Sequence, residues 1–357
     1  MKSYLLVLFI SSVCFFGCEK KILTSHAQEI KKDDTTTLKS MPFKIGAAVS
    51  AELLRVNTQY KDLVVKEFNS LTPENAMKFG IIHPAENYYN WPDADLILTL
   101  AAETGKRVHG HTLNWYADVP DWVKNFKGDT NAWENLLKNH IKNIVGHYKG
   151  KVASWDVVNE AFEDDGTLRN SIWVQKLGSD YIARAFQYAH EADPAALLFY
   201  NDYGQEWGYE HKSVKRVAIL NMVNDFLKRG IPIHGIGLQM HTRYTFSDDN
   251  ISLAIKSAAE TGLKIHISEL DVAMNATYDP SLSYSLSLEE MQAAKYKSIV
   301  KIYNSIPKSQ QFGITTWNVS DGDSWVPGFF RVPDWPLPFN NKYQRKLAYQ
   351  GILDGVK

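Results

Sequence analysis

Short apolar runs alternate with amphipathic segments along most of this chain. The runs have the length of buried strands, whereas the segments between them keep apolar residues at helical spacing, most clearly at 133–148 and 182–189. Strands that alternate with helices predict a parallel sheet, and eight of them predict a closed α/β barrel of the (β/α)8, or TIM barrel, type. The predicted strands are Lys44–Val49, Val65–Leu71, Arg107–His111, Val152–Val158, Leu197–Asn201, Gly235–Gln239, Leu263–Ser268 and Phe312–Trp317.

A doubly wound open sheet is the alternative arrangement of the same elements. Nucleotide-binding sheets of that kind carry a glycine-rich phosphate loop. This chain has no Gly-x-Gly-x-x-Gly after its first predicted strand and no Gly-x-x-x-x-Gly-Lys-Ser/Thr. The barrel is therefore the favoured prediction.

Composition narrows the class of substrate. The chain has 357 residues, 45% hydrophobic and 22% charged, enough to bury the core of one large domain. Its formal net charge is -1 and it has no lysine- or arginine-rich stripe, which argues against a nucleic-acid partner. Aromatic residues make up 12% of the chain, and those not used in the core can stack against the C–H faces of sugar rings. A neutral glycan fits these numbers.

The first residues have the pattern of an export signal. Lys2 precedes an apolar run, Tyr4–Phe16, that is too short to span a bilayer but fits a secretory signal. The run ends in Phe15-Phe16-Gly17-Cys18, which resembles a bacterial lipobox. We therefore expect residues 1–17 to be a lipoprotein-type signal peptide and Cys18 to be lipidated, with ordinary signal cleavage as the alternative.

The N-terminal segment also bounds the domain and its location. The only cysteines are Cys14 and Cys18, so the mature domain is expected to have no disulfide and no thiolate metal site. Residues 18–40 are polar and predict a flexible tether or a disordered leader, and residues 41–357 predict one catalytic barrel. We expect an exported monomer that is lipid-anchored at the outer membrane or cell surface, or else periplasmic or extracellular. The lipid would be its only link to a membrane.

Polar residues follow almost every predicted strand. Because the carboxyl ends of parallel strands meet at one rim of a barrel, these side chains are expected to form a binding site there, with ordinary solvated loops as the alternative. Among them are two glutamates, Glu160 and Glu269, and a pair of carboxylates facing each other across a sugar is the working part of a glycosidase. The strand-end residues are Glu74, Asn75, His111, Trp115, Asn159, Glu160, Asn201, Asp202, Gln239, His241, Glu269, Asp271 and Trp317.

Five motifs at these positions resemble glycoside hydrolase family 10, the endo-β-1,4-xylanases. The resemblance spans almost all of residues 41–357 and implies a (β/α)8 barrel that cleaves internal bonds of xylan with retention of configuration. Each motif alone is weak, but the five occur in the family's order, each at the end of a predicted strand. The motifs are Leu71-Thr72-Pro73-Glu74-Asn75-Ala76-Met77-Lys78, His109-Gly110-His111-Thr112-Leu113, Trp155-Asp156-Val157-Val158-Asn159-Glu160-Ala161, Gly237-Leu238-Gln239-Met240-His241 and Ile267-Ser268-Glu269-Leu270-Asp271.

The resemblance assigns the two carboxylates different roles. It implies that Glu269 is the nucleophile and Glu160 the acid/base. An ionised Glu269 nearby would keep Glu160 protonated by like-charge repulsion until Glu269 is esterified, after which Glu160 can act as the base. Neither step needs a metal or another cofactor, so none is expected.

Further residues match supporting positions of the family. Asn159 matches an asparagine that bonds the sugar 2-hydroxyl, and His241, if it is not simply a core histidine, would orient Glu269 while Asp271 orients the imidazole. The resemblance places Asn201 and Tyr203 toward the leaving-group side, although Asn201 could instead support its loop. The other residues expected to bind substrate are Glu74, Asn75, Lys78, His111, Trp115, Gln239, Trp317 and Trp325.

The chain departs from the family pattern at two positions. Tyr116 stands where the family usually has histidine, and Asn318 where it usually has glycine; these changes affect the sugar-gripping wall and the shape of the last loop. The stretch Val326–Asn340, rich in proline and aromatic residues, would form either another cleft wall or a cap on the barrel.

The predicted function is a retaining endo-1,4-β-xylanase acting on xylan or xylo-oligosaccharides. A β-1,4-glucanase on the same barrel is one alternative, because loop details read the substituent at sugar C5. A surface glycan-binding lipoprotein without catalysis is the other, but it would have no reason to keep both Glu160 and Glu269.

Overall fold

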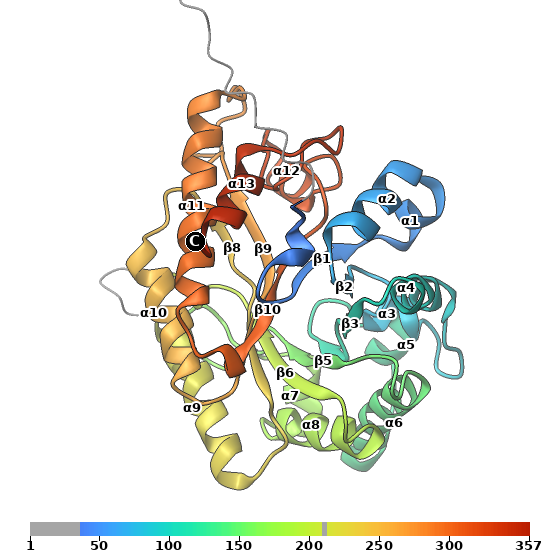
Figure 1. Cartoon of the computed structure of the whole chain (residues 1–357). Helices are drawn as coiled ribbons and strands as arrows, with labels where there is room; N and C mark the ends of the chain where they lie inside the picture. The colour runs from blue at the N-terminus through green and yellow to red at the C-terminus, as the bar shows by residue number, and fades with distance from the viewer. Residues whose placement is uncertain (1–35, 209–212) are drawn as a thin grey trace, which may run out of the picture. The chain divides into compact units, whose positions relative to one another are not determined.

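Eight parallel strands form a closed barrel in this computed structural model, which describes residues 36–208 and 213–357 (Figure 1). The strands follow one another around the barrel in chain order, and the last pairs with both the first and the one before it, which closes the ring. The predicted fold is confirmed. The barrel strands are β1 (Ile45–Val49), β2 (Ser70–Pro73), β3 (Arg107–Gly110), β5 (Ser154–Asn159), β6 (Leu197–Asp202), β7 (Gly235–Leu238), β9 (Lys264–Ala273) and β10 (Gln311–Thr316).

Helices surround the barrel because each connection carries an apolar stripe that the outer face of the sheet buries (Figure 1). In α6 (Thr130–His147) the Asp129 side chain caps the first turn by accepting from Ala132 N, and the predicted stripe from Trp133 to Ile144 is buried. The stripe at 182–189 is likewise buried, in α8 (Tyr181–Ala192). The other α-helices are α1 (Ala51–Val56), α2 (Thr58–Glu67), α3 (Phe79–Ile82), α4 (Pro92–Glu103), α5 (Asp121–Lys124), α7 (Ile172–Leu177), α9 (Val214–Arg229), α10 (Asp248–Ala259), α11 (Leu286–Asn304), α12 (Trp325–Phe330) and α13 (Leu347–Asp354), and two 3-10 turns span Leu38–Ser40 and Lys308–Gln310.

Two short strands extend the rim beyond the predicted eight. β4 (Asn114–Trp115) pairs with β5 and sets Trp115 beside Asn159. β8 (His241–Arg243) pairs with the second half of β9 and sets His241 beside Asp271. Both pairings therefore bring predicted site residues into neighbouring positions.

The second predicted strand was misplaced at its start. Residues 65–67 belong to α2, because Asn57 caps that helix and Tyr60, Val64 and Glu67 are buried at helical spacing. The β-branched pair Val64-Val65 is thus part of a helix face, and β2 begins only at Ser70. β9 also runs past its predicted end to Ala273, so that Glu269 lies within a strand.

The domain begins before the predicted boundary at Met41. Leu38 is fully buried, and its backbone N–H donates to Glu67 Oε2 at 3.1 Å. Residues 36–40, assigned to the tether, therefore belong to the domain as far as they are described. The predicted signal peptide, Cys18 and the rest of the tether lie outside the described residues. Across 36–208 and 213–357, none of the helices has both the length and the apolar character needed to cross a bilayer.

Candidate active site

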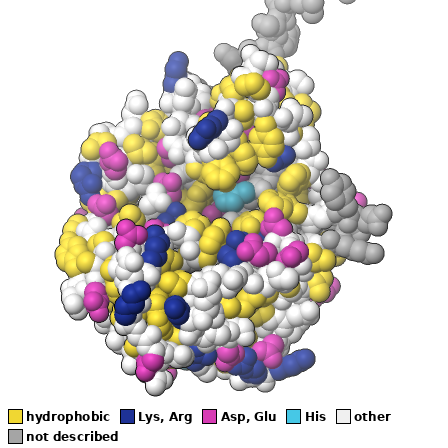
Figure 2. Space-filling model, turned by 180° about the vertical axis from the view of Figure 1, so that it is seen from behind, with side chains coloured by type: hydrophobic (Ala, Val, Ile, Leu, Met, Phe, Trp, Pro, Cys, Tyr) yellow, Lys and Arg dark blue, Asp and Glu magenta, His cyan; other side chains and the backbone are white. Residues whose placement is uncertain are grey.

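The predicted site residues gather at the carboxyl ends of the barrel strands. Glu160 directly follows β5, Gln239 follows β7, and Glu269 and Asp271 lie on β9. Figure 2 shows a face of the domain on which a histidine side chain is visible in a recess, between hydrophobic side chains and acidic groups.

Glu269 is a buried carboxylate held by two donors. The residue is 4% exposed; Asn201 Nδ2 donates to Oε1 at 2.7 Å, and His241 Nε2 lies 3.2 Å from Oε2. Burial alone would raise the pKa of Glu269, but the bond from His241 and the positive fields of His111 and His241 outweigh it and lower the pKa below its ordinary value. Glu269 is therefore ionised at neutral pH.

His241 is fixed between two carboxylates. Its Nδ1 lies 2.7 Å from Asp271 Oδ2, and that oxygen also accepts from Trp325 Nε1 at 2.8 Å. Burial works to lower the pKa of His241, but the charge of Asp271, its hydrogen bond and the contact with Glu269 raise it to about 10. The imidazole is thus a cation with both N–H groups donating, and it stabilises the charge of Glu269.

Glu160 has an unusual backbone and three side-chain donors. Its φ of 55° lies in the left-handed region, which a non-glycine residue adopts only when its surroundings hold it there. Trp115 Nε1 donates to Oε2 at 2.9 Å, while Gln239 Nε2 and Asn159 Nδ2 donate to Oε1 at 2.9 Å and 3.2 Å. The carboxyl group is therefore held in one orientation. The bond from Trp115 was not expected, because the sequence suggested only an aromatic wall.

Two amides link the glutamates. Asn201 Nδ2 donates both to Glu269 Oε1 and, at 2.8 Å, to Asn159 Oδ1, while Asn159 Nδ2 donates to Glu160. The structure thus brings Glu160 and Glu269 into one polar network.

Asn201 is enclosed by protein groups, which matches the supporting role left open from the sequence rather than the substrate-binding role. Its side chain is fully buried, and its Oδ1 accepts from Ser268 Oγ at 2.6 Å. Gly237 makes room for it, since a Cβ at that position would lie 2.1 Å from Asn201 Oδ1. Asn201 therefore supports Glu269 from behind.

Lys78 and three aromatic or amide partners form the wall next to Glu160. Lys78 Nζ donates to Asn75 Oδ1 at 2.8 Å and lies 5.3 Å from the ring centroid of Trp115 and 5.9 Å from that of Trp317. This ammonium over two indole rings is a cation–π arrangement that leaves N–H groups available to a ligand. The predicted residues of this wall are brought together.

Glu74 meets Asn318, one of the two departures from the family pattern. Burial raises the pKa of Glu74, while the hydrogen bond from Asn318 and the charge of Lys78 oppose that rise. Asn318 has a φ of 80°, a conformation that favours glycine and that asparagine tolerates better than most residues. Asn318 therefore keeps the backbone shape of a glycine and adds an amide, which also accepts from Trp325 N at 3.3 Å.

His111 is held by a buried carboxylate, that of Asp156, which the sequence did not indicate as functional. Its Nδ1 lies 2.9 Å from Asp156 Oδ2, and its ring packs edge-on against Trp317, with 5.1 Å between the ring centroids. His109 Nε2 lies 3.0 Å from the other oxygen of Asp156. Burial would raise the pKa of Asp156, but the two histidines outweigh it and lower that pKa. Asp156 lies inside a strand and not at its end, so its position in the sequence gives no indication that it contributes to the site.

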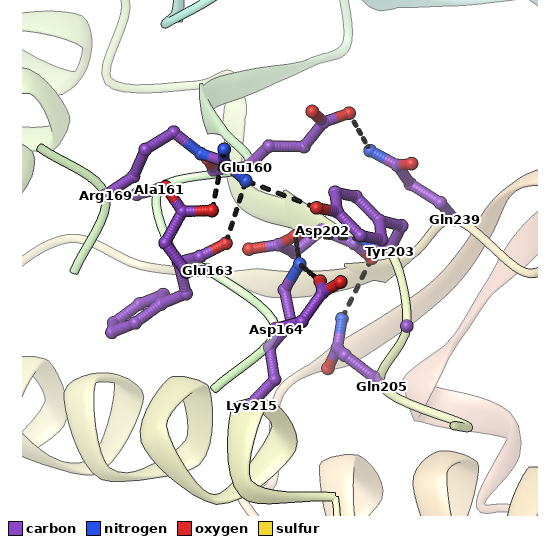
Figure 3. Close-up of polar contacts among 12 residues, drawn as sticks. Glu160, Ala161, Glu163, Asp164, Arg169, Asp202, Tyr203, Gln205, Lys215 and Gln239 are labelled. Carbon is purple, nitrogen blue, oxygen red and sulfur yellow. Dashed lines mark hydrogen bonds and ion pairs between the residues drawn. The ribbon is translucent and has the colours of Figure 1, made fainter. Parts of the chain in front are cut away.

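Tyr203 lies next to an arginine that sequence reasoning missed. Arg169 Nη2 donates to the Tyr203 hydroxyl at 3.2 Å, and Arg169 Nε donates to the Glu160 carbonyl at 3.1 Å (Figure 3). The guanidinium also lies 3.9 Å from the ring centroid of Tyr116, the second departure from the family pattern. An arginine in a loop gives no sign of such a role until the loop is folded.

The later part of the stretch Val326–Asn340 covers the end of β9, which matches the cap considered for it, while the cleft-wall role stays a prediction. The first residues of the stretch belong to α12, whose Trp325 binds Asp271. Farther along, Asp334 accepts from the backbone N–H groups of Met274 and Asn275, and Pro336 O accepts from Val272 N. This part covers the end of β9. Among the described residues, no group of three or more His, Cys, Asp or Glu side chains has an arrangement that could hold a metal ion.

Comparison with known proteins agrees with the geometry. The family profile described as "Glycosyl hydrolase family 10" matches residues 35–355. "Endo-1,4-beta-xylanase B" of Paenibacillus barcinonensis is 38% identical over 87% of this chain and 95% of its own length. "Endo-beta-1,4-xylanase Xyn10C" of Cellvibrio japonicus is 37% identical over 94% of this chain, which spans 59% of that relative's length. The crystal structure of xylanase 10B from Thermotoga petrophila in complex with xylobiose superposes with a TM-score of 0.83 at 35% identity, covering 90% of this chain and 97% of that one.

Proposed function

The chain belongs to glycosyl hydrolase family 10, and on that premise we propose that it is an endo-1,4-β-xylanase that hydrolyses internal β-1,4-xylosidic bonds with retention of configuration. The observation that carries the proposal is the pair of glutamates in one polar network but in different surroundings. Glu269 is buried beside a cationic histidine, whereas Glu160 has a left-handed backbone conformation at the end of β5 and amide and indole donors. Unequal surroundings are what separate nucleophile from acid in a retaining glycosidase.

The chemistry proceeds by two displacements. Glu269 attacks the anomeric carbon and forms a glycosyl ester, while Glu160 gives its proton to the departing glycosidic oxygen. With Glu269 esterified, Glu160 takes a proton from water, and the water oxygen attacks the same carbon and releases Glu269. Two inversions give net retention.

The neighbouring residues prepare Glu269 for this attack. His241, charged because of Asp271, keeps the nucleophile ionised, and the bond from Asn201 fixes one of its oxygens. The other oxygen accepts a hydrogen bond from the His241 imidazolium. This imidazolium can keep its position when Glu269 loses its negative charge by forming the ester. The site is thus preorganised for the charge changes of the reaction.

The residues on either side of the glutamates suit the binding of sugars. Glu74, Asn75, Lys78, His111, Trp115 and Trp317 supply polar and aromatic groups that we assign to one side of the cut bond. We assign Tyr203, with Tyr116 and Arg169 beside it, to the leaving-group side. A chain that contacts both sides is cut internally rather than from an end.

Reducing-end release from xylan and from carboxymethyl cellulose by one preparation tests the function. We expect rapid release from xylan, with short oligosaccharides and β-configured products by NMR, and much slower release from the glucan. Faster release from carboxymethyl cellulose would make the protein a glucanase, and binding of xylan without release would make it a glycan-binding protein.

We further propose, from the sequence of residues 1–18, export and anchoring through a lipid on Cys18, with the catalytic domain monomeric. Partition of the mature protein into the detergent phase of a Triton X-114 extract supports the anchor, and recovery of all the protein in the aqueous phase contradicts it.

A further inference from the structure

Lys215 is a buried cation that the proposed chemistry does not use. Its side chain is 2% exposed, and Nζ lies 2.9 Å from Asp202 Oδ1 and 3.5 Å from Asp164 Oδ1 (Figure 3). It stands at the second position of α9, where the helix dipole disfavours a positive charge. Burying a lysine is costly unless it is paired, so its position calls for an explanation beyond helix formation.

One route leads from Lys215 to the backbone next to Glu160 through Asp202. Asp202 is fully buried at the end of β6, and the Tyr200 hydroxyl donates to its Oδ2 at 2.5 Å. The same hydroxyl accepts from Ala161 N at 3.0 Å. Burial raises the pKa of Asp202 to about 7 even though Lys215 and Tyr200 oppose the rise. Without the ammonium of Lys215, the neutral form of Asp202 would be favoured. A neutral carboxyl group is a weaker acceptor, so the hydrogen bond from the Tyr200 hydroxyl would be weakened.

A second route passes through the ring of Tyr203. Lys215 Nζ lies 3.2 Å from the centroid of that ring. The hydroxyl group of the same tyrosine accepts a hydrogen bond from Arg169 Nη2. Arg169 Nε in turn donates to the carbonyl oxygen of Glu160. Arg169 is also held by an ion pair with Glu163 at 2.8 Å (Figure 3).

The two routes end on the same peptide group. The carbonyl of Glu160 and the N–H of Ala161 belong to one planar unit, so Arg169 holds one side of that plane and Tyr200 holds the other. The orientation of this plane sets ψ of Glu160, which together with its φ of 55° defines the left-handed conformation. A plane released from both hydrogen bonds would let the backbone at Glu160 relax toward an ordinary conformation, and that shift would move the side chain relative to its donors. A strained conformation of this kind persists only when neighbouring contacts fix it.

We propose that Lys215 is a positioning residue for Glu160: by pairing with Asp202 and supporting the ring of Tyr203, it locks the 160–161 peptide plane and with it the orientation of the acid/base carboxyl. The proposal rests on the proposed role of Glu160. In this proposal a residue at the start of α9 contributes to the proton-transfer step. Lys215 does so indirectly, because it contacts neither the substrate nor the carboxylates of Glu160 and Glu269.

The test is Lys215→Met, which keeps the length of the side chain and removes its charge. General acid catalysis matters for a poor leaving group and little for a good one, so two substrates separate the roles. We expect kcat/KM for xylopentaose to fall by about 10- to 100-fold and kcat/KM for 2,4-dinitrophenyl β-xylobioside to change by less than about 3-fold. Lys228→Met, the same change at an exposed position of α9, is the matched control and should leave both values unchanged.

Equal losses on both substrates, or no loss on either, would refute the positioning role. If Lys215→Met does not fold, as judged by circular dichroism, Tyr200→Phe decides the matter, because it removes the hydroxyl between Asp202 and Ala161 and keeps the ring. The same selective loss on xylopentaose is then required. Failure of the wild type to hydrolyse xylan would count against the proposed function instead, so the two failures are distinguishable.

Discussion

Glu269→Ala is expected to lower kcat for xylan hydrolysis by more than about 10,000-fold, as removal of a catalytic nucleophile does in other hydrolases. The methyl group cannot form the glycosyl ester, and no neighbouring carboxylate can replace it, since Asp271 is already bonded to His241 and Trp325. The fold should survive, because the network around Asn201, His241 and Asp271 keeps its other bonds. Steady-state kinetics with xylan measures the loss, and circular dichroism verifies the fold.

Azide provides the decisive control for this variant. The shortened side chain leaves space for a small anion, which can attack the anomeric carbon in place of Glu269. A single displacement then gives an α-xylosyl azide, detectable by NMR. Glu103→Ala, at an exposed position at the end of α4, is the matched carboxylate deletion and should retain full activity. Turnover of xylan by Glu269→Ala near the wild-type rate would remove Glu269 as the nucleophile.

Glu160→Ala is expected to separate substrates by their leaving groups. Hydrolysis of xylan should fall by about 100- to 10,000-fold, the usual contribution of a positioned general acid. For 2,4-dinitrophenyl β-xylobioside, kcat/KM should stay within about 10-fold of wild type, because a dinitrophenolate departs without a proton. Its kcat should still fall, since the second step lacks a base, and a burst of dinitrophenolate should precede slow turnover. Equal loss of kcat/KM on both substrates would contradict the acid role.

The pH dependence of the same variant gives a second readout. The wild-type rate should fall on the acidic side as Glu269 takes up a proton, and this limb lies at low pH because His241 and His111 lower the pKa of Glu269. In Glu160→Ala the acidic limb of kcat/KM for the activated substrate should remain, because it belongs to Glu269. Azide should restore kcat and give the β-xylosyl azide, because it attacks the ester from the open face.

Much of the barrel could be predicted from local pattern. Apolar runs and helical stripes depend on residues only a few positions apart, so they placed the strands without knowledge of their partners. The exception at 65–71 has the same cause: a β-branched pair occurs in strands and on buried helix faces alike, and only the cap at Asn57 and the burial of Tyr60 and Val64 settled it as a helix.

The rim residues were found because parallel strands end together, and the family motifs then supplied their roles. What could not be found were the contacts between residues distant in the chain. Asn201 and Glu269 are 68 positions apart, and Trp115 and Glu160 are 45 apart. Neither bond leaves a trace in the local pattern, and so Asn201 was assigned to the substrate side and Trp115 only to a wall.

The sequence by itself determined the class of fold, the rim and the two glutamates, because periodicity, strand ends and contiguous motifs are properties of neighbouring residues. Only the tertiary structure decided how those glutamates are held: a cationic His241 between two carboxylates, an amide bridge through Asn159 and Asn201, and a peptide plane fixed from Lys215. These depend on burial and on distances of a few ångströms between separate strands, and both arise only when the barrel closes.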